Sequence, residues 1–225
     1  MEWGTRDHRL ELDWLADEEF RTTMFDLLSI HTRRDCLRYL DTYGAAEVSE
    51  IAKHIAQQRE DSDWSENVVE NALSQNHLIR LGSEGLVEFD QESGTVEKAD
   101  EWRFNKAIEI LESVTSLEEH FTRAEIDSLF DGFSHRHRLK TIQALYELSG
   151  EAVLSEIAFH VANYEDDTGD IAKEHKKMYA TLYNVHIPKL SECNIVEKDD
   201  ETQQVTLVKN DDTVEYLLYD GFNQD

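Results

Sequence analysis

Hydrophobic residues recur at helical spacing over most of the chain. Within 32–43 and again within 135–148, apolar positions fall three or four residues apart and so share one face of a helix. A basic stretch precedes each segment, and a glycine, Gly44 or Gly150, follows it. Glycine is common just after a helix because it tolerates positive φ. The pattern therefore predicts two similar amphipathic helices, each ended by a glycine.

The chain contains this pattern twice because segments of its first half recur in its second half, at offsets of 105 to 109 residues. The recurring pairs are 25–29 with 130–134, 49–56 with 155–162, 77–81 with 186–190 and 86–88 with 195–197. The offset drifts only where loops are expected. Self-similarity of this kind indicates two copies of one domain.

Each copy predicts the same further elements. A second helix follows with Ser49 or Ser155 at its N-cap, and a third helix ends at Gly85 or Asn194, which both tolerate the left-handed conformation. Alternating apolar residues and a polar turn then predict a β-hairpin. Three helices and a hairpin are typical of a winged helix-turn-helix. We therefore expect a mainly α fold with small β-hairpins (α+β), built from tandem winged-helix domains joined by a helix.

The segments outside the copies also carry apolar stripes. An expected linking helix has apolar residues that fit either packing on the two domains or pairing with a second chain in a homodimer. Its stripe consists of Ile108, Leu111, Val114, Leu117 and Phe121. The expected organisation is an N-terminal helical extension at 1–24, a first domain at 25–101, a linking helix at 102–124, a second domain at 125–210 and a C-terminal tail at 211–225.

The charge of the chain is strongly acidic, with 49 Asp and Glu against 22 Lys and Arg and a net charge of −27. The acidity is dispersed over the whole length. Dispersed carboxylates suit a cytosol at molar salt, where self-repulsion is screened. We therefore hypothesise a halophilic archaeon, or its virus or mobile element, as the source. Because no stretch has the length of a membrane helix or the pattern of a signal peptide, we expect a cytoplasmic protein without membrane contact.

Cysteine, histidine and motif patterns favour a non-enzyme without cofactor or metal. Cys36 and Cys193 lie in apolar patterns and are expected to be buried free thiols. The histidines at 54 and 160, and at 77 and 186, recur at matched positions, and we interpret them as packing or capping residues. Phosphate-binding glycine loops, zinc-protease motifs and serine-hydrolase motifs are absent from the sequence.

Copy two resembles a winged-helix domain of unknown function that is widespread in haloarchaea and their mobile elements. The residues that carry the resemblance are Ser-Glu-Ile-Ala at 155–158, the tyrosine-containing segment 178–183 and His-Ile-Pro-Lys-Leu at 186–190. Copy one departs from this pattern, with Ile79 in place of proline and Glu70 in place of tyrosine. The resemblance covers most of both repeats but not residues 1–24 or the central segment, and it implies a DNA-binding transcriptional regulator.

The third helix of copy two is the predicted DNA reader, because recognition helices enter the major groove while flanking basic residues contact phosphates. Between 171 and 190 the chain has four lysines against one glutamate. The candidate DNA-binding residues are Lys173, His175, Lys176, Lys177, Tyr179, Thr181 and Asn184, with a second basic cluster of Arg136, Arg138 and Lys140. Such basic residues also occur as solvated helix starts, and the two tyrosines four residues apart fit packing as well as stacking.

Copy one is a poorer candidate for reading DNA because its third helix is slightly acidic. Asn67 and Asn71 remain candidates for adenine contacts, and Arg33 and Arg34 for backbone contacts. We expect double-stranded DNA as the partner of copy two, and we expect copy one to assist it or to bind a protein partner. The alternative is a tandem winged-helix scaffold for protein–protein interaction, of the chromosome-organisation or regulatory adaptor type, without specific DNA binding.

Overall fold

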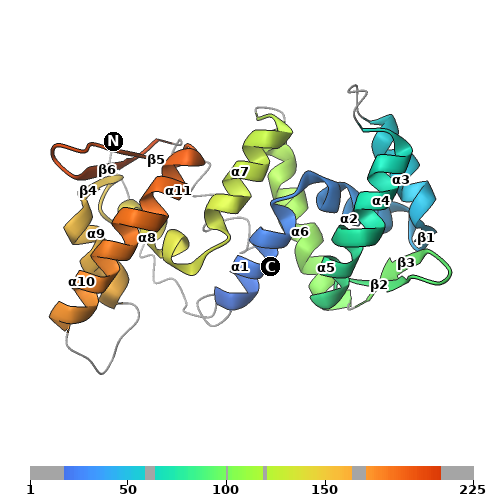
Figure 1. Ribbon diagram of the computed structural model, residues 1–225, viewed down its shortest axis with the longest axis horizontal. Helices are drawn as coiled ribbons and strands as arrows, with labels where there is room; N and C mark the ends of the chain where they lie inside the picture. Colours follow the sequence, from blue (N-terminus) through green and yellow to red (C-terminus); the bar gives the residue numbers. More distant parts are fainter. Residues whose placement is uncertain (1–17, 59–63, 100, 119–120, 164–170, 209–225) are drawn as a thin grey trace, which may run out of the picture.

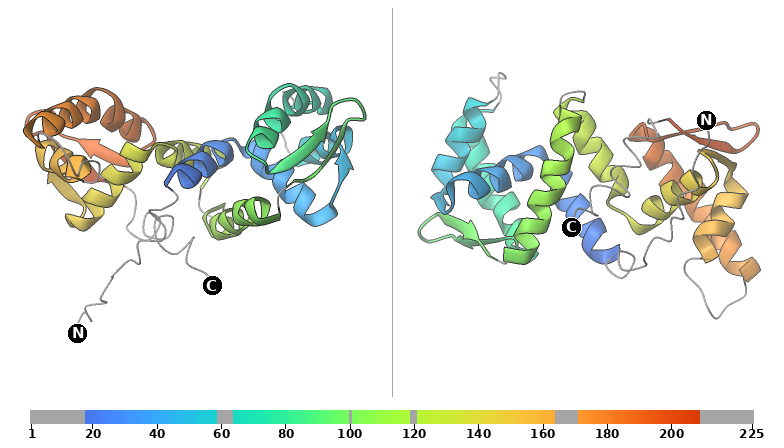
Figure 2. Two further views of the ribbon diagram at one scale, coloured as in Figure 1. Left: turned by 90° about the horizontal axis from the view of Figure 1, so that it is seen from below. Right: turned by 180° about the vertical axis from the view of Figure 1, so that it is seen from behind.

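The computed structural model describes residues 18–58, 64–99, 101–118, 121–163 and 171–208. The fold is mostly helical with two small antiparallel sheets, and it is α+β as expected. The molecule is elongated, with one copy of the repeat at each end (Figure 1). Helices α1 and α7 lie between the two copies, and α6 runs beside the first copy (Figure 2).

The first copy ends its helices at the glycines that the sequence marks. Gly44 has φ of 78° and its N–H donates to the Leu40 carbonyl oxygen at 2.9 Å, and Gly85 follows the third helix with φ of 72°. The elements are α1 (Glu18–Leu28), α2 (His31–Tyr43), β1 (Ala46–Glu47), α3 (Val48–Gln57), α4 (Glu66–Ala72), η2 (Leu73–His77), α5 (Leu78–Ser83), β2 (Val87–Asp90) and β3 (Thr95–Lys98). Of these, α4, η2 and α5 form the third helix, with η2 as a π-helical stretch.

The second copy repeats this order. Gly150 and Asn194 have φ of 90° and 54°, which confirms both as helix-ending residues. The elements are α7 (Arg123–Phe133), α8 (Arg136–Glu147), β4 (Glu151–Val153), α9 (Leu154–Asn163), α10 (Ile171–Thr181), η3 (Leu182–His186), α11 (Ile187–Glu192), β5 (Val196–Lys198) and β6 (Gln204–Leu207). Its third helix, α10–η3–α11, again contains a π-helical stretch.

Each copy carries a three-stranded antiparallel sheet. The strand order is β1-β3-β2 in copy one and β4-β6-β5 in copy two. In copy one Val96 pairs with Phe89 on one side and with Ala46 on the other. The two predicted hairpins are therefore confirmed. The sequence did not predict β1 and β4, because strands of two and three residues are too short to show an alternating pattern.

The predicted N-cap residues of the second helices, Ser49 and Ser155, are wrong, because both helices begin earlier in the sequence. Helix α3 begins at Val48, and the N-cap is Glu47, whose backbone N–H donates to the Glu50 side chain at 3.2 Å. Helix α9 begins at Leu154, one residue before the predicted cap Ser155. The physical reason is the preceding strand, because its extended backbone continues to Glu47 and the helix follows directly.

Helix α6 (Glu101–Glu118) is the predicted linking helix, and it packs against α2. Leu111 is buried and Ile108 is partly buried against the core. The predicted extent of the linking helix to residue 124 is wrong, because α6 ends at Glu118 and Phe121 lies, partly buried, between α6 and α7. Phe104 and Ala107 are also buried and extend this face toward the start of the helix. The side chains of Val114 and Leu117 lie outside the described residues, as do most of the predicted N-terminal extension and the whole tail 211–225.

The two copies pack against each other through their equivalent first helices, α1 and α7. The Phe25 ring lies 5.7 Å from the Phe130 ring and 5.3 Å from the Phe133 ring, measured between centroids. The buried residues of both copies belong to one continuous hydrophobic cluster. The predicted domain boundaries at 24–25 and 124–125 therefore fall inside helices that join the copies.

Both cysteines are buried free thiols, as predicted. Burial raises the pKa of the Cys36 thiol to about 12, so this side chain stays protonated and unreactive near neutral pH. Among the helices of the described ranges, none has the length and apolar character that crossing a membrane requires.

Candidate nucleic-acid interface

The third helix of copy two presents lysines on one face and buries apolar side chains on the other. Lys173, Lys176 and Lys177 are exposed, whereas Met178 and Leu182 are buried. Amphipathic spacing explains this separation, because residues three and four apart share a face. The exposed lysines of α10 together form a surface that we call the lysine face.

Polar side chains near the lysine face make bonds within their own copy. The Thr181 hydroxyl donates to the Lys177 carbonyl oxygen at 3.0 Å, and the Asn184 amide donates to the Ala180 carbonyl oxygen at 2.7 Å. A His175 ring nitrogen lies 2.9 Å from the Ser155 carbonyl oxygen, which ties α10 to α9. Thr181 and Asn184 retain oxygen acceptors that these bonds do not use.

The hairpin of copy two closes on the third helix through an aromatic contact that sequence analysis missed. The Lys198 ammonium lies 4.0 Å from the centroid of the Tyr183 ring, and Tyr183 stacks on Tyr179 at 6.2 Å. The Lys198 ammonium donates a hydrogen bond to the Asp200 carboxylate at 2.8 Å, which raises the pKa of Lys198 and keeps it charged. The four-residue spacing of the two tyrosines is consistent with their stacking. Nothing in the sequence predicts that the lysine of β5 contacts the Tyr183 ring.

Four of the predicted basic contact residues are buried in this structure, which does not favour the interpretation of them as phosphate contacts. These residues are Arg33, Arg34, Arg138 and Lys140, with exposed fractions of 7%, 1%, 8% and 7%. Arg136 is exposed at the start of α8 and remains a candidate. Burial lowers the pKa of each of the three arginines. They remain charged because guanidinium keeps its proton even after such shifts.

The buried arginines instead bind carbonyl oxygens at the ends of the first helices. Arg138 donates to the carbonyl oxygens of Gly132 at 2.9 Å and Asp131 at 2.7 Å. Arg33, its equivalent in copy one, reaches the matching carbonyls of Asp26 and Leu27 at 3.4 Å. Helix C-terminal carbonyls lack intrahelical donors, which explains why both copies place an arginine there.

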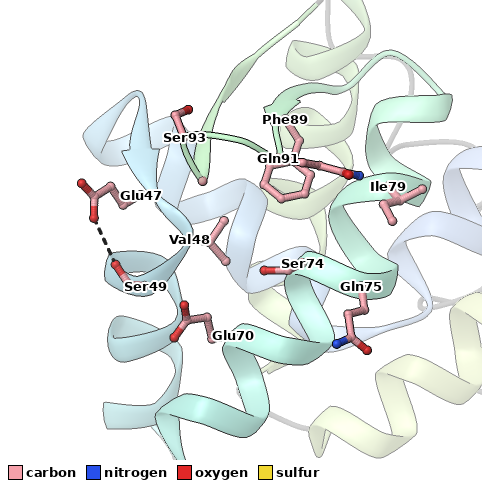
Figure 3. Close-up of a pocket in the computed structure, with 11 residues that line it drawn as sticks. Glu47, Val48, Ser49, Glu70, Ser74, Gln75, Ile79, Phe89, Gln91 and Ser93 are labelled. Carbon is pink, nitrogen blue, oxygen red and sulfur yellow. Dashed lines mark hydrogen bonds between the residues drawn. The ribbon is translucent and has the colours of Figure 1, made fainter.

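Copy one has a groove between its third helix and its hairpin, of about 590 Å³ (Figure 3). Glu47 and Glu70 make its lining acidic, while the exposed Ile79 and the Phe89 ring make part of it apolar. Asn67 and Asn71 are exposed on α4 but do not line this groove. At the matching positions of its third helix, copy two has Tyr179 in place of Glu70 and Pro188 in place of Ile79, so the two surfaces differ in charge.

The recurring histidines His77 and His186 are buried at the ends of the π-helical stretches, as their interpretation as packing residues predicted. In each, Nδ1 is buried without a hydrogen-bond partner among the described residues. Burial, reinforced by neighbouring positive groups, lowers the pKa of each to about 4, so both are neutral at pH 7. His186 also lies beside His135 and His137, which the sequence suggested only as part of a basic stretch.

A family described as a domain of unknown function (DUF7344) matches residues 25–97 and 130–206. The two matches span more than half of the chain, so the chain belongs to this family and contains the domain twice in tandem. This confirms the duplication that the internal repeats predicted. No curated protein matches the chain, and no solved structure matches it.

Proposed function

We propose that the chain is a tandem winged-helix DNA-binding protein that regulates transcription, and that it reads DNA mainly through α10–η3–α11. The observation that carries the proposal is the lysine face on this helix. We further propose that it acts in the cytoplasm of a halophilic archaeon or of a cell infected by its virus or mobile element.

The order of elements in each copy supports the winged-helix assignment. Helix, short strand, two helices and a hairpin follow one another, and the short strand pairs with the second hairpin strand. In a helix-turn-helix the second helix of the motif enters the major groove, and this corresponds to α10–η3–α11. The hairpin then lies beside that helix as a wing, as the contact of Lys198 with Tyr183 illustrates.

The charges of α10 support contact with a phosphate backbone. Lys173, Lys176 and Lys177 are exposed in a chain with a net charge of −27. Lys177 lies 3.5 Å from Glu174, but this is an exposed pair that costs little to break. Such lysines position a protein on DNA, while Thr181 and Asn184 supply groups that recognise base edges.

The arrangement of the two copies supports binding along one DNA duplex. The third helices of both copies lie on the same side of the elongated molecule (Figures 1 and 2). Packing of α1 against α7 fixes this arrangement within one chain. Dimeric winged-helix and helix-turn-helix proteins use two such helices to read two half-sites. We expect a site with two parts, of which copy two reads the stronger.

The experiment is selection of bound fragments from random-sequence duplex DNA by the purified full chain in about 2 M KCl, followed by sequencing. High salt is required because the release of counterions from DNA favours binding less as the salt concentration rises. Phosphate attraction therefore falls steeply, and base contacts decide which fragments are retained. We expect an enriched motif. Absence of enrichment with a chain folded by circular dichroism would contradict the proposal.

The lysine face is then tested with Lys176→Glu, whose binding to the enriched duplex is measured by fluorescence anisotropy. We expect affinity to fall at least about tenfold, in line with the roughly 1–3 kcal/mol of a lost direct contact. The matched control is Lys106→Glu on α6, which makes the same charge change on a lysine that pairs with Glu109. Equal losses for both variants would show a bulk charge effect and would overturn the assignment of the surface.

A second function is favoured by one observation, the acidic and partly apolar groove of copy one. Glu47 and Glu70 repel phosphate, whereas exposed Ile79 offers an apolar contact for a protein. On this alternative the chain is an interaction scaffold without specific DNA binding. Failure of the DNA selection, together with a folded chain, would favour it.

A further inference from the structure

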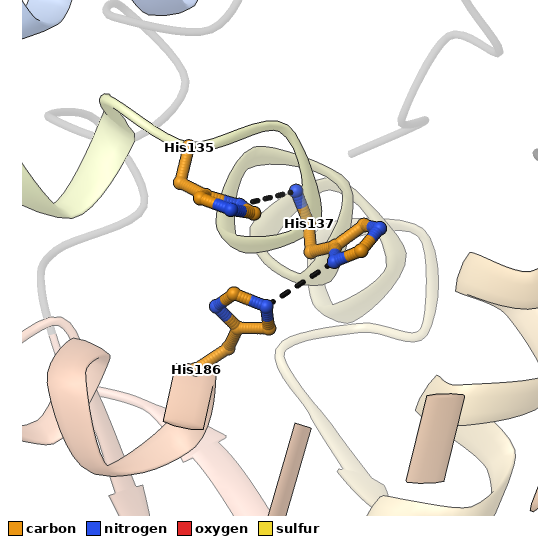
Figure 4. A group of neighbouring side chains, drawn as sticks. All are labelled: His135, His137 and His186. Carbon is orange, nitrogen blue, oxygen red and sulfur yellow. Dashed lines mark hydrogen bonds between the residues drawn. The ribbon is translucent and has the colours of Figure 1, made fainter. Parts of the chain in front are cut away.

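Three imidazole rings meet where α8 begins and η3 ends (Figure 4). His135 directly precedes α8, His137 lies in its first turn, and His186 is the last residue of η3. The centroid of the His186 ring lies 4.4 Å from that of the His135 ring and 5.1 Å from that of the His137 ring. One ligand nitrogen from each residue can be chosen so that all three lie within 4.8 Å of one another.

The distances suit a metal ion of the zinc class. His137 Nδ1 and His186 Nε2 are 3.2 Å apart. Zinc–nitrogen bonds of about 2.0–2.1 Å place two ligands of a tetrahedral ion roughly 3.3 Å apart. The third ring must move inward by a rotamer adjustment, and His135 is only partly buried, so it has the freedom to do so. Its Nδ1 accepts from the His137 backbone N–H at 3.1 Å, a bond that ligation through this nitrogen would exchange.

His186 has the features of a preformed ligand. Its side chain is 3% exposed, and its Nδ1 is buried without a hydrogen-bond partner among the described residues. The nitrogen-bearing edge of its ring faces the rings of His135 and His137 (Figure 4). Its other nitrogen, Nε2, lies 3.2 Å from His137 Nδ1 and is the atom that would bind the ion, so burial of the ring holds the ligand nitrogen in place.

The nearest positive charge is already balanced. Arg138 lies beside His186, but its guanidinium is 3.7 Å from the Asp131 carboxylate and binds helix carbonyls. Three imidazole nitrogens then form the ligand set, which suits Zn²⁺, Co²⁺ and similar ions more than Mg²⁺ or Ca²⁺.

Copy one provides an internal comparison. At the positions of His135 and His137 it has Ile30 and Thr32, and only His77 matches His186. Both copies therefore keep the histidine that ends the π-helical stretch, and only copy two has histidines at the other two positions.

We propose that His135, His137 and His186 bind one zinc-class divalent ion, with a fourth position open to water or to an external ligand. The ion joins the start of α8 to the third helix of copy two and so fixes that helix relative to the rest of its domain. This proposal does not depend on DNA binding.

The test uses the full chain, stripped of metal, in about 2 M KCl so that weak binding to surface carboxylates is screened. The probe is Co²⁺, because tetrahedral Co²⁺ absorbs strongly in the visible range and carboxylate-bound octahedral Co²⁺ does not. We expect one Co²⁺ per chain with a tetrahedral spectrum, displacement by Zn²⁺, and a higher melting temperature with Zn²⁺. Absence of the tetrahedral spectrum would overturn the proposal.

The decisive variant exchanges His135→Ile and His137→Thr, the residues that copy one carries. We expect Co²⁺ affinity to fall by more than about tenfold, since even outer-shell changes at metal sites cost that much. The matched control His77→Gln removes the equivalent buried histidine of copy one and should leave Co²⁺ binding unchanged. Retained binding in the double variant, or equal loss in the control, would overturn the assignment.

A second measurement on the unaltered chain does not depend on how the variant folds. Ring protons of imidazoles bound to Co²⁺ have large paramagnetic shifts in the proton NMR spectrum. We expect signals from three imidazoles, and a spectrum with fewer than three ligated rings would contradict the site.

Discussion

The Arg138 guanidinium binds the end of helix α7, donating to the Gly132 and Asp131 carbonyl oxygens and to the Ser134 hydroxyl at 3.0 Å. These oxygens lie where the helix leaves its carbonyls without internal donors. A planar guanidinium reaches several acceptors at once, which an ammonium does less well. Because Arg138 is 8% exposed, its contacts act largely out of water and are expected to stabilise the fold.

Arg138→Met is therefore expected to lower the free energy of unfolding by about 2–4 kcal/mol, since it leaves buried carbonyl oxygens without donors while keeping a side chain of similar length. Denaturant unfolding followed by circular dichroism in concentrated KCl measures this change. The control Arg136→Met, on the exposed residue two positions earlier, should cost much less, about 0.5 kcal/mol. Similar losses in both variants would refute a stabilising role for the Arg138 contacts.

Some of the predicted basic residues are exposed and others are buried, and this difference shows how far the candidate site could be predicted from the sequence. Helical periodicity placed Lys173, Lys176 and Lys177 on the exposed side of α10, because the alternating apolar residues must face the core. Periodicity could not separate Arg136 from Arg138. Their difference depends on where the end of the preceding helix lies in space, and a sequence of basic residues does not contain that information.

At the scale of elements, helices and hairpins followed the apolar pattern. The π-helical stretches were not predicted, although the sequence contains a signal for them. Leu73 and Leu78 are both buried and lie five residues apart, as are Leu182 and Ile187. A regular helix with 3.6 residues per turn puts such pairs on different faces. The i to i+5 bonds of a π-helix bring them back to one face, so this spacing in both copies was a usable signal.

Helix α7 packs closely on the segment between α11 and β5, and this contact explains a glycine within the helix. A Cβ added at Gly132 would overlap with Ile195 Cδ1, a fully buried atom group in the core, and would come within 3.6 Å of Cys193 Cβ. Copy one has Leu27 and Leu86 at the equivalent positions. Gly132 therefore leaves the space that the Cδ1 atom of Ile195 occupies.

Gly132→Ala is expected to lower the free energy of unfolding by about 1–3 kcal/mol through overpacking, despite the higher helix propensity of alanine. Ile195→Val removes the overlapping Cδ1, so the double variant Gly132→Ala/Ile195→Val should recover most of the loss. The measurement is a double-mutant cycle of denaturant unfolding. Additive losses would show that the two residues do not contact each other in the folded protein.

At the scale of the whole molecule, the two copies share charged as well as aromatic contacts. Arg34 of copy one is 1% exposed and donates to the Asp127 carboxylate of α7 at 2.6 Å, and His31 lies 2.7 Å from the same carboxylate. Arg123 of α7 lies 3.2 Å from Asp35 in return. These pairs cross between the copies, so they couple their stabilities in a way that the repeated sequence alone did not reveal.

Asp127→Asn is expected to destabilise both copies together, because it leaves the buried Arg34 charge without its carboxylate. Removing one partner of a fully buried pair costs about 3–5 kcal/mol, and the partial exposure of Asp127 reduces the expected loss to about 1–3 kcal/mol. In a variant with Trp3 and Trp14 replaced by phenylalanine, the remaining Trp64 and Trp102 lie in copy one and in the adjacent α6, so tryptophan fluorescence follows copy one, while far-ultraviolet circular dichroism follows both copies. We expect the two unfolding curves to coincide and to shift together to lower denaturant.

The control is Asp41→Asn, which breaks the exposed pair of Asp41 with Lys98 inside copy one and should change stability by less than about 1 kcal/mol. Asp127 belongs to copy two. If the interface couples the stabilities of the two copies, the Asp127→Asn substitution must also shift the unfolding curve that is followed by the fluorescence of copy one. A shift in circular dichroism without a shift in fluorescence would mean that the copies unfold independently. The α1–α7 contact would then hold two separately stable domains in place without contributing to the stability of either.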